Sequence, residues 1–201
     1  SGVDLNKFKY SEPNESEFIK FLFIGRLIYH KGIREIFQAS QNLKSNYPKV
    51  KFQFLGFIDN DNKSSISRKK LNNYIEEGVI EYLGETDNVI KFIKDSDCVL
   101  LPSYREGMPK SLLEASAIGR PIIGSDSPGC KHLIQDGHNG FICKSRDSDS
   151  LTKILIKFIS LDTNKRKEMG KNAYNYVVEN FDENIIIKEY ITLLMDLNKV
   201  K

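Results

Sequence analysis

The stretch from Ser103 to Gly124 reads SYREGMPKSLLEASAIGRPIIG, and it decides which fold the sequence predicts. It follows a short apolar run, Cys98 to Pro102, of the kind that forms a buried parallel strand. Pro109 suits the first position of a helix, because its missing N–H would be unpaired there. Gly119 would end that helix, and a second apolar run follows it. The stretch therefore predicts a strand, a loop, a helix and another strand in succession.

Two carboxylates flank the predicted start of this helix. A helix N-terminus offers free N–H groups and a positive dipole end, which suit an anion such as a diphosphate. Gly107 lets a ligand approach the backbone closely, and the side chain of Glu114 leans back toward the helix start. Glu106 lies on the preceding loop, and carboxylates accept hydrogen bonds from sugar hydroxyls. The arrangement suggests a nucleotide sugar, although two solvated glutamates would give the same pattern.

The stretch REGMPKSLLEASAIGRPIIGSD resembles the signature of retaining glycosyltransferases with the two-domain GT-B architecture. More narrowly, it is similar to a bacterial group that includes lipopolysaccharide, capsule and lipid-linked oligosaccharide transferases. The family pattern has a Glu, a following Gly, a Pro, and a second Glu after seven intervening residues. Glu106, Gly107, Pro109 and Glu114 match this pattern in type and spacing. The chain departs from the broad family at Pro128 and His132, so His132 is given no role.

A second loop strengthens the resemblance. Phe18 to Ile24 reads as the first central strand, and the loop from Gly25 to Gly32 precedes a segment with helical spacing. Ligands of doubly wound sheets bind at such strand-to-helix loops. The loop resembles the family's Gly-Arg…Lys-Gly segment, which implies that Arg26 and Lys31 hold the donor diphosphate. Two solvated basic residues are the alternative.

The resemblance implies a role for each matching residue. Glu106, Arg26 and Lys31 would act on the reacting donor, with Glu106 orienting its sugar hydroxyls. Glu114 would accept hydrogen bonds from the ribose hydroxyls. The remaining donor-binding residues would be Gly25, Leu83, Gly84, Gly107, Met108, Pro109, Lys110 and Ser111, with Leu83 and Gly84 near the base. No metal ion and no cofactor are expected, since such enzymes usually need no metal, and the nucleotide sugar is the substrate.

Length and composition exclude several classes of protein. The chain has 201 residues and a formal net charge of +3, so composition shows no broad nucleic-acid footprint. Its three cysteines have neither metal-ligand spacing nor the number of a disulfide framework, which suits a reducing compartment. No apolar run reaches the length of a membrane span. We therefore expect a cytoplasmic location. The resemblance adds the expectation of peripheral contact at the inner face of the membrane, made through another domain.

The domain organisation follows from the beginning of the chain. Residues 1–17 read as an interdomain linker or N-terminal arm, and residues 18–201 as a nucleotide-sugar-binding domain with C-terminal helices. SGVDLNKF resembles the family's interdomain segment, which implies a missing N-terminal acceptor domain. In the family the last helix packs toward that domain. Its apolar residues here would be partly uncovered; they are Ile187, Tyr190, Ile191, Leu194 and Leu197.

Alternating apolar runs and helical segments predict an α/β fold, a Rossmann-like doubly wound parallel sheet of about six strands with helices on both faces. With the resemblance, it would be one half of a GT-B enzyme. The function would be retaining transfer of a hexose-type sugar from a nucleotide donor, with a UDP-linked sugar expected, to a saccharide or lipid-linked acceptor in surface glycan synthesis. A nucleotide-binding module without transfer activity is the alternative. A dinucleotide oxidoreductase is a weaker third reading, since no Gly-x-Gly-x-x-Gly follows the first strand.

Overall fold

The sheet has six parallel strands, and it is seen in a computed structural model that describes residues 2–199, apart from the side chains of 193 and 196–199. Its order is β3-β2-β1-β4-β5-β6. The strands are β1 (Ile19–Ile24), β2 (Val50–Leu55), β3 (Glu81–Gly84), β4 (Cys98–Leu101), β5 (Ile122–Ser125) and β6 (Gly140–Cys143). The order reverses between β1 and β4, so the sheet has the topology of a Rossmann-like fold.

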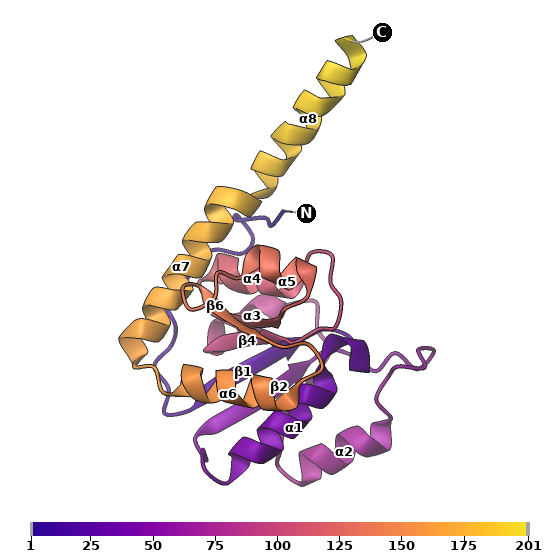
Figure 1. Ribbon diagram of the computed structural model, residues 1–201, viewed down its shortest axis with the longest axis vertical. Helices are drawn as coiled ribbons and strands as arrows, with labels where there is room; N and C mark the ends of the chain where they lie inside the picture. Colours follow the sequence, from indigo (N-terminus) through magenta and orange to yellow (C-terminus); the bar gives the residue numbers. More distant parts are fainter. Residues whose placement is uncertain (1, 200–201) are drawn as a thin grey trace.

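Helices cover both faces of the sheet (Figure 1). One face carries α1 (Ile33–Lys44), α2 (Arg68–Glu76) and α6 (Ser148–Ile159). The other carries α3 (Val89–Asp95), α4 (Lys110–Ile118) and α5 (Pro128–Leu133). The long helix α7 (Thr163–Phe181) packs against α4, and α8 (Glu183–Lys199) extends away from the body of the domain. The predicted fold class is confirmed.

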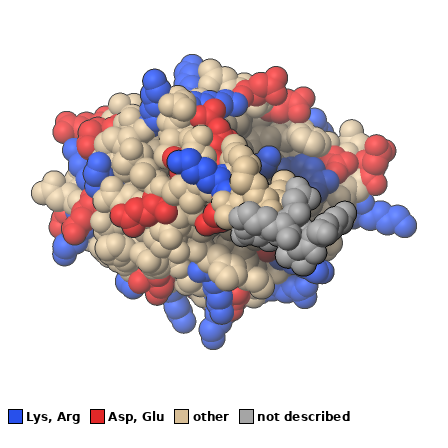
Figure 2. Space-filling model, turned by 90° about the horizontal axis from the view of Figure 1, so that it is seen from above, with Lys and Arg blue, Asp and Glu red and all other residues tan. Residues whose placement is uncertain are grey.

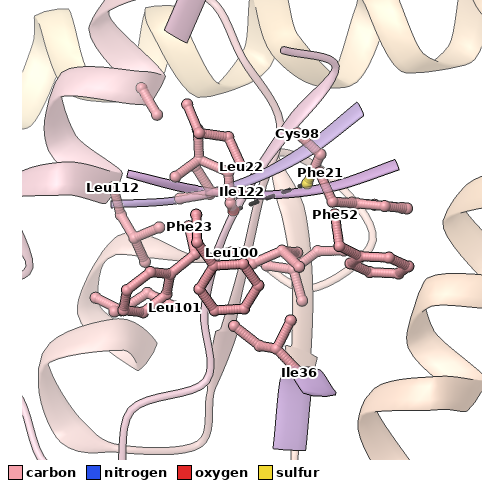
Figure 3. Close-up of a cluster of buried hydrophobic side chains, with 14 of the residues drawn as sticks. Phe21, Leu22, Phe23, Ile36, Phe52, Cys98, Leu100, Leu101, Leu112 and Ile122 are labelled. Carbon is pink, nitrogen blue, oxygen red and sulfur yellow. Dashed lines mark hydrogen bonds between the residues drawn. The ribbon is translucent and has the colours of Figure 1, made fainter. Parts of the chain in front are cut away.

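The core is built from aliphatic and aromatic side chains of the central strands. Phe21 of β1 stacks on Phe52 of β2 with ring centroids 5.3 Å apart, and Ile36 approaches from α1 (Figure 3). Strand β4 is buried at every position, as expected for a central parallel strand with helices on both faces. This packing holds β1 and β4 side by side, so the loops that follow the two strands also lie next to each other.

The start of α4 differs from the sequence prediction. Pro109 is the N-cap of α4, not its first residue, with ψ 99° outside the helical region. Helix α3 starts after the N-cap Asn88, whose side chain makes no capping hydrogen bond. Instead, the hydroxyl of Thr86 accepts a hydrogen bond from the N–H of Asn88 at 3.1 Å.

The N-terminal arm packs on the domain. Val3 and Phe8 are buried, and the N–H of Val3 donates to the carbonyl of Phe181 at 2.8 Å. Helix α8 begins at that point, and its apolar side chains Ile187, Tyr190, Ile191 and Leu194 are exposed by 47 to 66%. The side chain of Leu197, predicted to join them, lies outside the described residues. The boundary between an arm and a domain at residue 17 stays a prediction.

Within residues 2–199, no helix combines the length and the apolar character needed to cross a bilayer. On the face drawn in Figure 2, basic and acidic side chains are interspersed.

Candidate functional site

The candidate site lies at the carboxyl edge of the sheet, where the strand order reverses between β1 and β4. The loop 25–32 leaves β1 and the loop 102–109 leaves β4, so the two flank this switch point. Open α/β sheets bind ligands in the crevice at such a point. The structure thus brings together the two loops that the sequence singled out separately.

Lys31 and Glu106 form an ion pair across the switch point. Lys31 Nζ lies 2.5 Å from Glu106 Oε1, and the side chains are 25% and 11% exposed. The two residues are 75 positions apart in the chain, so only the fold brings them into contact. A half-buried ammonium with three donor positions has two left when one is given to Glu106. The pair therefore offers a cation for an anionic ligand and a fixed carboxylate beside it.

Gly32 sets the path of the Lys31 loop. A short 3₁₀ turn, η1 (Tyr29–Lys31), ends at Gly32, which has φ +77° in the left-handed region. A Cβ at this position would also lie 2.1 Å from the carbonyl oxygen of Pro102. Only glycine tolerates both the conformation and the close approach. The β1 loop can therefore lie directly against the end of β4.

The N-terminus of α4 has free donors. Among the described residues, the N–H groups of Lys110 and Ser111 have no backbone or side-chain acceptor. A Cβ on Gly107 would meet nothing within 4 Å, so space is open beside this part of the loop. From the opposite side, Gly129 of α5 presses on the loop, and a Cβ there would lie 2.3 Å from the carbonyl oxygen of Gly107. The loop is thus packed against α5 on one side and open beside Gly107, as an anion site requires.

Arg26 lies on the other side of the β1 exit. Its Nη1 is 3.0 Å from Asp59 Oδ2, and the Arg26 side chain is 49% exposed. Gly25 and Arg26 line a cleft of about 650 Å³, together with Phe57 and residues 85–87 at the exits of β2 and β3. A second cavity of about 440 Å³ lies at the opposite edge of the sheet, between the arm and α7. Of these two, the cleft at the carboxyl edge is the one that the β1 loop lines, through Gly25 and Arg26.

Leu83 and Gly84 end β3, next to this cleft. Gly84 has φ +76°, and its carbonyl oxygen accepts a hydrogen bond from the N–H of Gly56 at 2.7 Å. A Cβ on Gly84 would meet nothing within 4 Å, so the backbone there is open. Leu83 is partly buried and packs against the core. Their proposed role at a nucleotide base stays a prediction.

Glu114 is less closely connected to the pair. Among residues 2–199 no hydrogen bond or ion pair joins its carboxylate to Lys31 or Glu106. Burial raises the pKa of Glu114, and the positive charges of Lys7 and Lys110 oppose that rise. The carboxylate of Glu114 therefore lies within electrostatic reach of the arm as well as of the helix start. Its proposed contact with a ribose stays a prediction.

Sequence reasoning missed several residues that shape the site. The sequence patterns assign no role to Asp59 or Gly129. They assign none to Glu35 or Tyr104 either. In the described part of the chain, no three His, Cys, Asp or Glu side chains are grouped closely enough to hold a metal ion.

The family model for "Glycosyl transferases group 1" matches residues 4–176. The chain belongs to this family. A relative from Campylobacter jejuni, N,N'-diacetylbacillosaminyl-diphospho-undecaprenol alpha-1,3-N-acetylgalactosaminyltransferase, is 34% identical over 96% of this chain. The putative colanic acid biosynthesis glycosyltransferase WcaL of Escherichia coli is 27% identical over 98% of it. The chain spans about half the length of these relatives, 52% and 50%.

Solved structures agree on the fold. Sucrose-phosphate synthase from Thermosynechococcus elongatus matches with a TM-score of 0.84 and 20% identity, covering all of this chain and 52% of that one. HepE of Anabaena, solved with UDP and glucose, matches with a TM-score of 0.82 and 22% identity, covering 97% and 55%. The C-terminal domain of a Francisella tularensis group 1 glycosyl transferase matches with a TM-score of 0.77 and 22% identity, covering 90% and 99%. The chain therefore has the architecture of one half of a GT-B enzyme.

Proposed function

We propose that this chain is the donor-binding half of a retaining glycosyltransferase and that its donor is a UDP-linked sugar. The observation that carries the proposal is the Lys31–Glu106 pair, whose Nζ and Oε1 are 2.5 Å apart at the switch point. A diphosphate needs a cation, and a sugar needs a hydroxyl acceptor beside it. The structure of HepE with UDP and glucose, and the N-acetylgalactosaminyltransferase name of the Campylobacter relative, support this donor class.

In this proposal each residue has a distinct task. Lys31, Arg26 and the free N–H groups at the start of α4 stabilise the negative charge that develops on the departing diphosphate. Such preorganised donors act without reorganising during the reaction. Glu106 orients the hydroxyls of the donor sugar, and Glu114 binds the ribose. The positive charge comes from the chain itself, so we propose that no metal ion or cofactor takes part, and EDTA should leave donor binding unchanged.

The acceptor belongs to a further domain in this proposal. The acceptor is a saccharide or lipid-linked saccharide of a surface glycan, and any peripheral contact with the inner face of the membrane comes through that domain. Holding the acceptor against the donor carbon can supply about 7–11 kcal/mol of the barrier. The 201-residue chain alone should therefore bind donor but transfer little or no sugar.

The first experiment is calorimetric titration of the chain with UDP, GDP, ADP and uridine, followed by the matching nucleotide sugars. We expect the tightest binding for UDP and its sugars, and weaker binding for uridine because it lacks the diphosphate. A chain that binds none of these nucleotides would contradict the proposed function. Preferred binding of GDP or ADP would retain the site and correct the base.

The second experiment incubates the chain with the nucleotide sugar that binds best and a panel of lipid-linked acceptors. No transfer is expected from the chain, whereas a longer protein that contains it should transfer sugar with retention at the anomeric carbon. Turnover by the chain alone within the usual enzyme range of about 1–1,000 per second would place the acceptor site here. A longer protein that binds donor but never transfers would favour a nucleotide-binding module instead.

A further inference from the structure

Glu35 and Tyr104 form a hydrogen bond beside the candidate site, and the proposed function uses neither. The hydroxyl of Tyr104 donates to Glu35 Oε1 at 2.8 Å. Glu35 is only 6% exposed, and its second oxygen, Oε2, is buried with no partner among the described residues. Buried carboxylates are uncommon, because burial disfavours the charge and each oxygen left without a donor adds to the cost. A retained carboxylate here calls for an explanation.

The position of Glu35 offsets part of that cost. It lies in the first turn of α1, where the positive end of the helix dipole favours a carboxylate. Within residues 2–199 it has no ion-pair partner, so the hydroxyl of Tyr104 is the donor that the structure supplies. Burial, and then the bond to Glu35, raise the pKa of Tyr104 to about 12. Tyr104 is a donor at neutral pH in any case, since even the ordinary tyrosine pKa of 10.0 lies well above 7.

Tyr104 also connects the two loops of the site. Its backbone N–H donates to the carbonyl of His30 at 2.9 Å, and the hydroxyl of Ser103 donates to the same oxygen at 2.9 Å. His30 immediately precedes Lys31, and Tyr104 stands two residues before Glu106. The face of the Tyr104 ring carries the guanidinium of Arg146 at 4.8 Å from the ring centroid. Arg146 is the described non-glycine residue with positive φ, 60°, so its backbone adopts an uncommon conformation at this contact.

We propose that Glu35 and Tyr104 are positioning residues, which hold the Lys31 and Glu106 loops in register so that both side chains face the same donor. This role rests on the proposed function. Without the bond, the 103–104 segment keeps its backbone contact with His30 but loses its link to the rigid helix α1. Glu106 then samples more positions, and its contact with the donor sugar weakens more than the contact of the free helix amides with the diphosphate.

The test compares binding of UDP with binding of UDP-N-acetylgalactosamine and UDP-glucose by calorimetry, well below the melting temperature. Tyr104→Phe removes only the hydroxyl, and Glu35→Leu removes the acceptor, while Glu35→Gln keeps an acceptor oxygen. For Tyr104→Phe and Glu35→Leu we expect a roughly tenfold loss of affinity for the preferred UDP-sugar, the size of one hydrogen bond to a charged group. UDP affinity should fall less, so the preference for the sugar form over UDP shrinks. Glu35→Gln should stay within about threefold of the parent chain.

Matched controls separate positioning from stability. Tyr174→Phe removes a hydroxyl on α7, and Glu76→Gln changes an exposed carboxylate on α2, so both should leave every affinity unchanged. A purely structural role would lower the melting temperature of Tyr104→Phe and Glu35→Leu without changing the ratio of UDP to UDP-sugar affinity, and that outcome overturns the positioning role. If the parent chain binds no UDP, the proposed function fails instead. If the parent binds and both variants keep its affinities, only the positioning role is lost.

Discussion

Arg120 and Lys31 lie at opposite edges of the same sheet, and the difference in their burial indicates different roles. A fully buried cation stabilises the fold, whereas a partly exposed one can bind a ligand. Arg120, at the amino edge, is fully buried, and its guanidinium donates to acceptors of the chain itself, both nearby and distant in sequence. Lys31, at the carboxyl edge, is 25% exposed and is held by one carboxylate. A cation whose donors are all taken holds the fold together. A cation with donors left over, beside an open helix start, is available to an anion.

The guanidinium of Arg120 donates hydrogen bonds to three segments, the ends of α3 and α4 and the N-terminal arm. Its donors reach carbonyl oxygens at the ends of α3 and α4, where the last turn of each helix leaves carbonyls without an intrahelical partner. They also reach the N-terminal arm, so the guanidinium joins the arm to the domain. The acceptors are the carbonyls of Ser11, Glu12, Ile93, Lys94, Ile118 and Gly119, and the hydroxyl of Ser11.

The largest expected effect tests whether Arg120 stabilises the fold. Arg120→Met keeps much of the apolar stem but leaves several buried carbonyls without a donor, each worth about 1–3 kcal/mol. We expect the free energy of unfolding to fall by at least about 3 kcal/mol, measured by denaturant titration. Far below the transition, UDP affinity should stay near that of the parent chain, because Arg120 lies at the edge opposite the site.

A matched variant is Arg68→Met on the exposed start of α2, which should change stability by less than about 0.5 kcal/mol. If Arg120→Met unfolds like the parent but binds UDP poorly, the division between the two edges of the sheet is wrong.

The next largest effect tests whether Lys31 binds the diphosphate. Lys31→Ala removes the proposed diphosphate cation and leaves Glu106, only 11% exposed, without its partner. Hydrogen bonds to charged groups are worth about 1.5–3 kcal/mol, so we expect UDP affinity to fall by about 10- to 100-fold. Uridine affinity should change much less. Calorimetry with both ligands measures the difference, and Lys69→Ala on α2 is the exposed control. Equal losses for uridine and UDP would place Lys31 away from the diphosphate.

A smaller effect is expected at Arg26, whose contribution to UDP binding can be compared with that of Lys31. Its side chain is 49% exposed and pairs with Asp59, and exposed ion pairs are worth about 0.2–1 kcal/mol. Arg26→Ala should therefore weaken UDP binding by about two- to fivefold. Added salt should reduce the Arg26 contribution more than the Lys31 contribution, because exposed charges are screened more strongly. A loss at Arg26 that exceeds the one at Lys31 would reverse the assigned importance of the two residues.

Local patterns in the sequence predict most of this fold. The apolar run Cys98 to Pro102 becomes β4, and Gly119, with φ +86°, ends α4 as expected. The helix predicted to begin at Ile33 does so, because its apolar residues recur at helical spacing and face the sheet. These features depend on neighbours within one or two turns, which a sequence displays directly.

The contacts of the site are less visible in the sequence. Matching motifs indicated that Lys31 and Glu106 act on one ligand, but not that they form an ion pair. The buried bond of Glu35 to Tyr104 spans 69 positions, and Glu35 alone resembles an exposed glutamate in a first helical turn. Arg120 likewise resembles a solvated residue between a glycine and a proline, because its acceptors come from segments up to 109 positions away. Long-range partners of polar side chains follow from topology, not from local spacing.

Glu114 provides the smallest expected effect, and one that connects stability with binding. Burial raises the pKa of its carboxyl above the ordinary 4.5. The folded chain therefore holds that proton more tightly than the unfolded chain, so folding gains from Glu114 below pH 4.5 and loses that gain as pH rises through the folded pKa. At neutral pH, part of the free-energy cost of burying the ionised Glu114 is not offset by other interactions. The neutral amide of a glutamine would avoid that cost.

Glu114→Gln should therefore melt slightly higher than the parent chain at pH 7, and the difference should disappear as pH falls below 4.5. The same change should weaken UDP binding, because a neutral amide is a poorer acceptor for the ribose hydroxyls than a carboxylate. Thermal melts at several pH values and calorimetry with UDP measure the two effects on one variant. Glu76→Gln on the exposed face of α2 controls for the loss of a charge and should change neither quantity. A variant that melts higher and binds UDP as well as the parent would show that Glu114 is a buried carboxylate without a ribose to bind. A variant that melts lower at pH 7 would show instead that Lys7 and Lys110 stabilise the charge, and that the arm is held in part through this residue.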